Sequence, residues 1–473
     1  MIDSRFFENA AAFNNSNRWV IGFSGGLDST VLLHLCVQYR ELYRSDLELL
    51  AVHVNHQLSP LAAEWQTHCE ALCRQWQVPF VAHKVVVKTG SRRSIEQVAR
   101  DQRYRVFEQE SQPGDLLLLA HHLDDQIETL LYRLVRGSGA LGLRGIDSYV
   151  ERGSLAIWRP LMASSRADLE HYGADQQLQW VEDPSNQDIR HDRNFIRQQL
   201  LPLMASRWPA VRDTLGRSGR LLGEASALAN DLARIDLADI ESASDDSIFQ
   251  RSSTLSIAAL QQLPLHRQKN CIRYWIGTRG ALLPSEKVLE QVINCVAHYH
   301  SQLNANISWR GDFAGSDRCA NDHATNNALR WEIHTFRGYL YLERSVPPIE
   351  PDWQRALVSG QSIELPSGLG VISLDSPGQD SSAKELALNS SARHPLVVRF
   401  RRGGEHFRPA GRKQKLLKKW LQDWQIPQWE RDRIPLIFHG EDLIAVVGQA
   451  VAQGFQPQAG EPSQILRWEQ PPD

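Results

Sequence analysis

Two short stretches carry residue types that could bind an anion and hold a proton or a cation. The first is Ser24-Gly25-Gly26-Leu27-Asp28-Ser29, which follows the apolar run Val20–Phe23. Glycine allows backbone angles that other residues avoid and lets a ligand approach the main chain. A helix that opens here would aim unpaired N–H groups and a partial positive charge at the turn, so an anion fits there. The Gly-Lys-Ser/Thr of a Walker loop is missing, and a capped Gly-Gly turn is the structural alternative.

The second stretch is His121-His122-Leu123-Asp124-Asp125-Gln126-Ile127-Glu128. On a helix, His121, Asp125 and Glu128 stand at i, i+4 and i+7 and share one face. Acidic residues at a helix start can serve only to cap the helix and to interact favourably with its dipole. One carboxylate would suffice for that, so we interpret the cluster as functional. Carboxylates beside a bound triphosphate are typical of a Mg²⁺ site, and one of them could instead act as a general base.

Apolar runs that alternate with helical patterns must position these stretches. Strands are expected over 18–23, 47–55, 78–87 and 115–120, and helices over 28–39, 60–76, 94–109 and 122–136. Such alternation predicts βαβ units and a doubly wound parallel sheet. Ligands bind at the carboxyl ends of strands in such sheets, where both stretches fall. His53 and His56 end the second strand and are expected to form pocket wall.

Composition bounds the class of protein. The chain has 473 residues, 42% of them hydrophobic and 23% charged, which is typical of a globular protein with two to four domains. A net charge of −3 gives no global sign of nucleic-acid binding. The six cysteines form no Cys-x-x-Cys pair, which favours a reducing compartment over disulfides or zinc. Without a signal peptide or an apolar span, we expect a cytoplasmic protein that does not enter a membrane.

Local basic clusters do suggest a large anionic substrate. Residues 190–220 hold seven arginines and two aspartates, and 393–433 hold twelve Lys/Arg against four Asp/Glu, with tryptophans interleaved. A further cluster comprises Arg92, Arg93, Arg100, Arg103 and Arg105. Cations can contact phosphates and aromatics can stack on unpaired bases, although most charge runs are solvated faces and most tryptophans pack in cores. We expect domains at 1–215, 216–345 and 352–473, with a Pro-rich linker over Ser345–Pro351.

Several motifs together carry a family resemblance. Ser24–Ser29 resembles the pyrophosphate loop (PP-loop) of the N-type ATP pyrophosphatases. The motifs that narrow the match to the tRNA(Ile)-lysidine synthetase family are His53-Val-Asn-His56, Ala99-Arg-x-x-Arg103-Tyr104, His121–Thr129, Arg136-Gly-Ser-Gly139, Arg159-Pro-Leu161, Arg193-Asn-x-Ile-Arg197, Arg402-Gly-Gly-Glu405 and Ile426-Pro-x-Trp-Glu-Arg431. The match covers nearly the whole chain. It departs at Gln57-Leu58-Ser59, where many members carry Gly-Leu-Arg.

The resemblance implies a fold and a reaction. The fold would be a PP-loop ATPase domain with a doubly wound, HUP-like α/β sheet, then a mainly helical middle domain and a small α+β C-terminal domain. The reaction would adenylate C2 of the wobble cytidine in the CAU anticodon of a minor tRNA(Ile), using ATP and Mg²⁺. Free L-lysine would then displace AMP to give lysidine. A monomer or homodimer would carry this out.

The resemblance also implies residue roles. Ser24, Gly25, Gly26, Leu27, Asp28 and Ser29 would bind the ATP phosphates. Asp28, His121, Asp125 and Glu128 would be catalytic, holding Mg²⁺ (at Asp28 and Asp125) or positioning lysine. Arg103, Arg193 and Arg197 would contact the tRNA backbone or the adenylate phosphate, and the basic C-terminal domain would bind the acceptor stem.

Two other functions remain open. One is another tRNA-directed ATP pyrophosphatase such as a thiolase, although no cysteine pair is suitably placed. The other is a tRNA-binding protein without catalysis, against which the intact loop and the acidic cluster argue.

Overall fold

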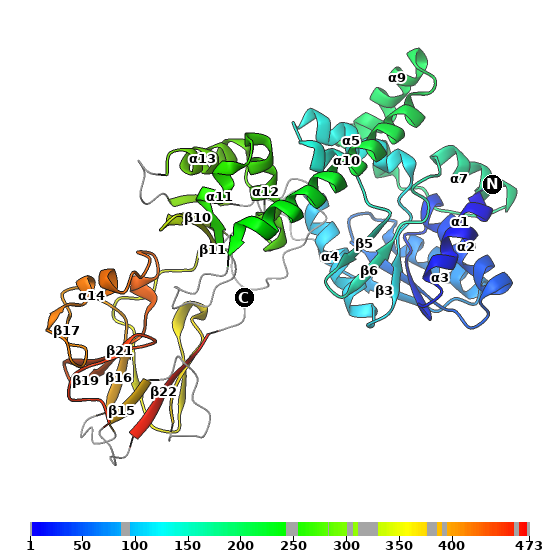
Figure 1. The fold of residues 1–473 in the computed structure, drawn as a ribbon. Helices are drawn as coiled ribbons and strands as arrows, with labels where there is room; N and C mark the ends of the chain where they lie inside the picture. The colour runs from blue at the N-terminus through cyan, green and yellow to red at the C-terminus, as the bar shows by residue number, and fades with distance from the viewer. Residues whose placement is uncertain are drawn as a thin grey trace. The chain divides into compact units, whose positions relative to one another are not determined.

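The computed structural model describes residues 2–86, 95–242, 254–281, 283–299, 306–310, 330–375, 386–389, 395–457 and 463–470. Contacts divide the chain into two compact units, which are described separately below. Unit 1 comprises Met1–Ala229, and unit 2 comprises Asn230–Asp312 with Thr325–Asp473 (Figure 1).

Unit 1 is built on one twisted sheet. Its strands are β1 (Arg18–Gly22), β2 (Glu48–Asn55), β3 (Phe80–Lys84), β4 (Leu116–Leu118), β5 (Tyr149–Arg152) and β6 (Leu155–Trp158). The spatial order is β3-β2-β1-β4-β6-β5, and β5 alone runs antiparallel to its neighbour. Strand order reverses between β1 and β4, so the segments that follow these two strands meet at the switch point where such sheets bind ligands.

Helices cover both faces of this sheet (Figure 1). They are α1 (Ile2–Ala10), α2 (Leu27–Tyr43), α3 (Ala62–Gln75), α4 (Ile95–Glu110), α5 (Leu123–Val135), α6 (Ala140–Leu143) and α7 (Arg166–Asp175). Trp19 and Ile21 of β1 pack into one apolar cluster with α1, α2, α3 and α7, while Val20 packs into another with α4. Burial on both faces explains why the strands read as continuous apolar runs.

The rest of unit 1 is helical. After the short turns η1 (Ala11–Phe13) and η2 (Pro184–Gln187), the elements are α8 (Asp192–Phe195), the π-helical turn η3 (Ile196–Leu200), α9 (Leu201–Arg207) and the long α10 (Val211–Ile240), which continues into unit 2. The sequence placed the start of that last helix at Leu221, ten residues too late.

The first part of unit 2 combines helices with a sheet. Its helices are α11 (Ile257–Gln262), α12 (Leu265–Thr278) and α13 (Glu286–Ala297), and its strands are β7 (Glu241–Ser242), β8 (Thr254–Ser256), β9 (Asn306–Arg310), β10 (Arg330–Phe336) and β11 (Tyr339–Arg344). The antiparallel order is β7-β8-β11-β10-β9. Trp275 and Ile272 of α12 are buried in one core with Ile333 and Leu340 of the sheet.

The second part of unit 2 contains two antiparallel sheets. One is formed by β12 (Gln354–Leu357), β16 (Leu396–Arg399), β19 (Leu436–His439), β20 (Asp442–Val446) and β21 (Ala450–Val451). The other is formed by β13 (Ser362–Glu364), β14 (Val371–Asp375), β22 (Ser463–Glu469) and β15 (Leu386–Asn389). The ribbon β17 (His406–Phe407) and β18 (Lys415–Leu416), the helix α14 (Leu417–Asp423) and the turns η4 (Pro366–Gly368) and η5 (Arg431–Arg433) complete it.

A tryptophan of the second part packs against the sheet of the first. The Trp429 ring stacks on His334 of β10 at a centroid distance of 4.2 Å and an interplanar angle of 11°. Its indole N–H donates to Glu343 Oε1 at 2.8 Å, and Arg433 donates to the other carboxylate oxygen at 3.4 Å. Trp429 is therefore a packing residue, whereas the sequence pattern also allowed a base-stacking role.

The predicted fold class is confirmed, from the doubly wound sheet to the small α+β end. The three sequence-based domain boundaries stay a prediction. Within the described part of the chain, no helix is both long and apolar enough to cross a bilayer. The five described cysteines are buried free thiols; Cys319 and the basic residues Arg92 and Arg93 lie outside the described residues.

Candidate active site

The loop between β1 and α2 has the tight backbone that its glycines predicted. Gly25 has φ of +85°, and a Cβ on it would lie 2.6 Å from the Cys69 sulfur and 3.2 Å from a Val181 methyl. Val181 N–H also donates to Gly25 O at 2.9 Å, so a later segment holds the loop from outside. The result is a fixed turn that presents the N-terminus of the 17-residue helix α2.

Some hydroxyls of the loop hydrogen-bond to its backbone, and one belongs to an exposed residue. Ser29 is buried, donates to Gly26 O at 3.0 Å and accepts from Ser24 N–H at 3.2 Å. Thr30 Oγ1 donates to Gly25 O at 3.4 Å. Ser24 Oγ is exposed and 3.0 Å from Ser29 Oγ. Leu27 is buried, so it can offer a ligand only its backbone N–H. Of the loop side chains, Ser24 and Asp28 are the ones placed to meet a ligand.

His53 holds the loop from behind. Its Nδ1–H donates to Phe23 O at 2.9 Å, and the Cys69 sulfur lies 3.7 Å from the same nitrogen. Burial lowers the pKa of His53, and it raises the pKa of the Cys69 thiol to about 12. Burial, followed by the positive charge of Arg103, lowers the pKa of His56 to about 4. Both histidines are thus neutral wall residues, as the sequence suggested.

The start of α5 places His122, rather than His121, beside the acidic residues. The helix begins at Leu123 with His122 as N-cap, so His121 precedes the helix and shares no helical face with Asp125 and Glu128. His122 Nδ1 accepts from Asp124 N–H at 3.2 Å, and Asp125 Oδ2 accepts from His122 N–H at 2.9 Å. This reciprocal capping box satisfies two N–H groups that the first turn would otherwise leave unpaired.

Two of the candidate carboxylates, Asp28 and Asp125, converge on one imidazole nitrogen, that of His122. His122 Nε2 lies 3.6 Å from Asp28 Oδ2 and 3.6 Å from Asp125 Oδ2. Because Nδ1 accepts a hydrogen bond, the ring proton sits on Nε2, between the two carboxylates. Burial lowers the pKa of His122, but the carboxylates of Asp28, Asp125 and Asp124 outweigh it and give a net rise. A second proton, on Nδ1, would break the helix cap.

Asp28 is the carboxylate that the loop contributes, and its surroundings shift its pKa. Burial raises its pKa, but His122, Arg166 and Arg197 together bring it below the ordinary value. Arg166 Nη1 lies 3.5 Å from Asp28 Oδ1. Asp28 is therefore ionised at neutral pH, and its carboxylate lies near one imidazole and two guanidinium groups.

Asp124 binds neighbouring helices rather than a ligand. It is buried, and its Oδ2 accepts from the backbone N–H of Arg166 at 2.8 Å. Its Oδ1 accepts from Arg212 of α10 at 3.0 Å. One carboxylate thus fixes the N-terminus of α7 and the first turns of α10 against α5.

The structure corrects the geometry expected for Glu128 and Arg197. Arg197 Nε donates to Glu128 Oε1 at 2.6 Å and Nη2 donates to Oε2 at 3.1 Å, so both carboxylate oxygens are engaged. Nη2 also lies 3.5 Å from Asp125 Oδ1. Burial raises the pKa of the Glu128 carboxyl, while the guanidinium opposes that rise. The pair ties η3 to α5, while the catalytic role of Glu128 and the tRNA contact of Arg197 stay predictions.

His121 is held in a different environment from the one expected. Arg159 Nε donates to His121 Nδ1 at 3.2 Å, which places the imidazole proton on Nε2. Arg159 is almost fully buried, and its other guanidinium nitrogens donate to Asp147 O at 2.8 Å and Tyr104 Oη at 3.4 Å. Burial first, and then the nearby arginines, hold the pKa of His121 well below its ordinary value. His121 is thus a fixed neutral donor.

Arg103 and Arg193 remain candidates for contact with an anion. Arg103 is exposed on α4, and Arg193 is half-buried on α8. Both are close enough to His121 to lower its pKa. Tyr104 stacks between Arg152 at 3.9 Å and Arg100 at 5.3 Å. The edge of the sheet beyond β4 and β6 is therefore strongly cationic, which suits a phosphate.

The fit of Mg²⁺ rests on Asp28 and Asp125. Within the described ranges, no group of three His, Cys, Asp or Glu side chains is arranged to hold a metal ion. Mg²⁺ is commonly bound by one or two carboxylates and the substrate's phosphates, and it keeps several waters, so a complete protein cage is not required. The oxygen ligands of Asp28 and Asp125 fit that mode.

The sequence analysis singled out the loop, the acidic cluster and the motif that contains Arg159. It did not anticipate two contacts, those of Arg166 and of His122. Arg166 meets Asp28 because it opens α7, and no motif in the sequence singled it out. His122 caps α5, and the signal was the capping-box spacing to Asp125.

Comparison with known proteins places the chain in a class and then in a family. The family model described as PP-loop domain matches residues 2–204, so unit 1 carries the ATP-using PP-loop domain. The models described as TilS substrate binding domain and TilS substrate C-terminal domain match residues 255–341 and 396–468.

The curated relatives identify the family. The tRNA(Ile)-lysidine synthase of Coxiella burnetii is 36% identical over 453 residues, covering 95% of this chain and 92% of that protein. The one from Pseudomonas fluorescens is 35% identical and covers 94% and 92%. This chain belongs to the tRNA(Ile)-lysidine synthase family, and it is an enzyme. The solved U34-tRNA thiolase NcsA from Methanococcus maripaludis, with its [4Fe-4S] cluster, aligns over 47% of this chain and 78% of its own, with a TM-score of 0.41 and 15% identity.

We predict that Gly25→Ala destabilises unit 1 by about 2 kcal/mol or more, because φ is positive and the new Cβ would overlap Cys69. Gly26→Ala is the matched control: its φ is −74° and its nearest neighbour is 3.7 Å away, so the cost stays below about 1 kcal/mol. Urea unfolding compares the two. Equal stability of both variants contradicts the packing described for the loop.

We predict that Glu128→Gln costs about 2–4 kcal/mol of stability, since it leaves a guanidinium without its carboxylate and Arg197 is only 32% exposed. The double variant Glu128→Gln/Arg197→Met should cost less than the sum of the single changes. A double-mutant cycle in urea measures this coupling. Additive single effects would mean that the ion pair contributes nothing to stability.

We predict that Arg159→Met raises the pKa of His121 and adds an ionisation to the acid limb of the kcat/KM profile. In the wild type the folded pKa is depressed, so the folded state loses stability relative to the unfolded state as pH falls below about 6.5, where only the unfolded imidazole takes a proton. Labelled-histidine NMR and the pH profile test this. Arg44→Met, which removes an arginine bound to Asp46, is the control and should leave both unchanged.

Proposed function

We propose that the chain ligates free L-lysine to C2 of the wobble cytidine in the CAU anticodon of a minor tRNA(Ile), by way of an adenylated tRNA. Membership of the family supports the overall reaction. The observation that carries the proposal is the meeting of Asp28, His122 and Asp125 beside the N-terminus of α2. It supports an anion site and an ammonium site that would lie next to each other. The reaction belongs in the cytoplasm, where tRNA and free lysine occur.

In the first step the cytidine O2 attacks the α-phosphate of ATP. An O–P bond forms, the bond to the β-phosphate breaks, and pyrophosphate leaves. The backbone N–H groups of residues 25–29 and the Ser24 hydroxyl would bind the phosphates, and Arg103 and Arg193 would answer the charge on the α-phosphate. Mg²⁺ held by Asp28 and Asp125 would neutralise charge on the phosphate oxygens when bound.

In the second step the lysine ε-amine attacks C2 of the cytosine. A C–N bond forms, the C–O bond to the adenylate breaks, and AMP leaves. The incoming ammonium must first lose a proton, because only the free amine is a nucleophile. Asp125 is the carboxylate best placed to orient it, since its Oδ1 meets only the longer 3.5 Å contact with Arg197. His121 would act as a neutral N–H donor toward the leaving group.

Substrate selection would lie with unit 2. The exposed cations of 408–419 extend into the first turn of α14, within the region matched by the C-terminal substrate domain. Their charge suits a tRNA stem, and we assign the acceptor stem to this surface.

The test is incubation with ATP, labelled lysine and total tRNA, followed by nucleoside analysis. We predict that Asp125→Ala lowers lysine incorporation at least roughly 100-fold with tRNA affinity nearly unchanged. Asp168→Ala is the matched control, because Asp168 forms the same capping box at the start of α7 and is exposed there. Asp125→Asn keeps the cap acceptor and isolates the charge.

Three outcomes separate the alternatives. An active Asp125→Ala variant removes Asp125 from the chemistry. Sulfur in place of lysine in the product indicates a thiolase. Tight tRNA binding without tRNA-dependent ATP–pyrophosphate exchange in the wild type indicates a binding protein.

A further inference from the structure

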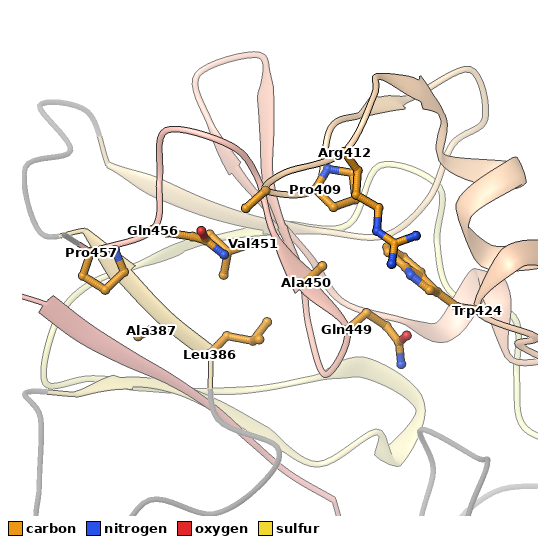
Figure 2. Close-up of a pocket in the computed structure, with 11 residues that line it drawn as sticks. Leu386, Ala387, Pro409, Arg412, Trp424, Gln449, Ala450, Val451, Gln456 and Pro457 are labelled. Carbon is orange, nitrogen blue, oxygen red and sulfur yellow. The ribbon is translucent and has the colours of Figure 1, made fainter. Parts of the chain in front are cut away.

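The second part of unit 2 contains an open cavity of about 540 Å³, a size within the range of small-molecule sites. It lies where the edge strand β21 of one sheet meets the edge strand β15 of the other. Arg412, Trp424 and Gln449 gather at one end, Gln456 and Pro457 lie at the other, and Ala450 lies between them (Figure 2). None of the side chains that line it is acidic.

The wall at the Trp424 end is a supported aromatic platform. Trp424 is half-buried and stacks on the buried Trp420 at 5.7 Å and 26°, with Phe407 edge-on at 6.1 Å. Trp420 is fixed by donating to Phe407 O at 2.9 Å. Trp424 is therefore held by its neighbours and still borders open space, which is the arrangement that stacks on an unpaired base.

The polar groups around the platform match a nucleotide. The amides of Gln449 and Gln456 each supply a donor and an acceptor, as the edge of a nucleobase requires. Arg412 supplies a guanidinium that can stack or bind phosphate. Its guanidinium carbon lies over the Trp420 ring at 5.9 Å from the centroid, so the cation is held beside the aromatic platform.

The rim is cationic and largely uncompensated. Residues 408–419 contain Arg408, Arg412, Lys413, Lys415, Lys418 and Lys419, all exposed, and no acidic residue. Lys415 pairs with Asp423 at 2.8 Å. In the described ranges, no carboxylate lies within ion-pair distance of Arg412, Lys413, Lys418 or Lys419. A cationic guest is disfavoured here, and an anionic one is attracted.

We propose that this cavity binds one unpaired nucleotide of the tRNA, with its base on Trp424, its base edge at the glutamines and its phosphate at Arg412. The proposal rests on the proposed function, because it takes tRNA as the substrate. It adds a base-recognition site to a surface otherwise assigned to phosphate contact. Recognition of a single unpaired base would let the enzyme read a position away from the anticodon.

The first test separates stacking from charge. Trp424→Ala and Gln449→Ala should each weaken tRNA binding, the first by about 10- to 100-fold, with the salt dependence of Kd unchanged. Trp424→Phe keeps a flat ring and should stay near the wild type. Lys418→Ala, a phosphate-type control, should weaken binding and reduce the salt slope by about one. Filter binding over a KCl series measures all four.

The second test does not depend on a substitution that removes packing contacts of Trp424. A photoreactive benzoylphenylalanine at Gln449 or Gln456 should crosslink to the tRNA transcript, and reverse transcription should map the site to an unpaired nucleotide. The same residue at Gln354, exposed on β12 and outside the cavity, is the control. A crosslink confined to paired stem, or none beyond the control, overturns the proposal, as does an affinity within twofold of wild type for both Trp424→Ala and Gln449→Ala.

Lysidine formation by the wild type is measured in parallel. Lysidine without the predicted crosslink removes the nucleotide site and leaves the proposed function standing. The crosslink without lysidine keeps the nucleotide site and removes the proposed reaction.

Discussion

The candidate active site depends on how the N-terminus of α5 is capped. A buried helix start must satisfy its first N–H groups, and here His122 and Asp125 do so reciprocally. The same hydrogen bonds fix His122 Nε2 and the Asp125 carboxylate opposite Asp28, which is itself in the first turn of α2. The N-termini of α2 and α5, at one edge of the sheet, thus define the geometry of the candidate site. The candidate catalytic groups take part in the hydrogen bonds that hold the fold.

Much of the fold could be predicted because the signals are local. Strands β1, β2 and β4 read as apolar runs since both faces of the sheet are buried, and Gly25 of the loop has a positive φ that favours glycine. The strands of unit 2 were harder, because several of them, such as β13 and β21, are very short and alternate weakly.

The site could be predicted in its residues but not in their pairing. The helix begins so that His122, and not His121, lies next to the carboxylates. The spacing i, i+4 and i+7 cannot distinguish these two histidines unless the capping residue is known. The Glu128–Arg197 pair spans 69 residues of sequence, so no local motif could show it. Buried Arg159 shows the same limit: its partner His121 is 38 residues away, and only the fold brings them together.

The sulfur of Cys69 has a consequence for how the loop can be observed. It lies directly beneath Gly25, fully buried, and burial raises its thiol pKa to about 12. A reagent that modifies thiolates can reach it only when the loop lifts away from α3. Its alkylation rate therefore reports loop opening from within the native chain, and a ligand that closes the loop will protect Cys69 without touching it.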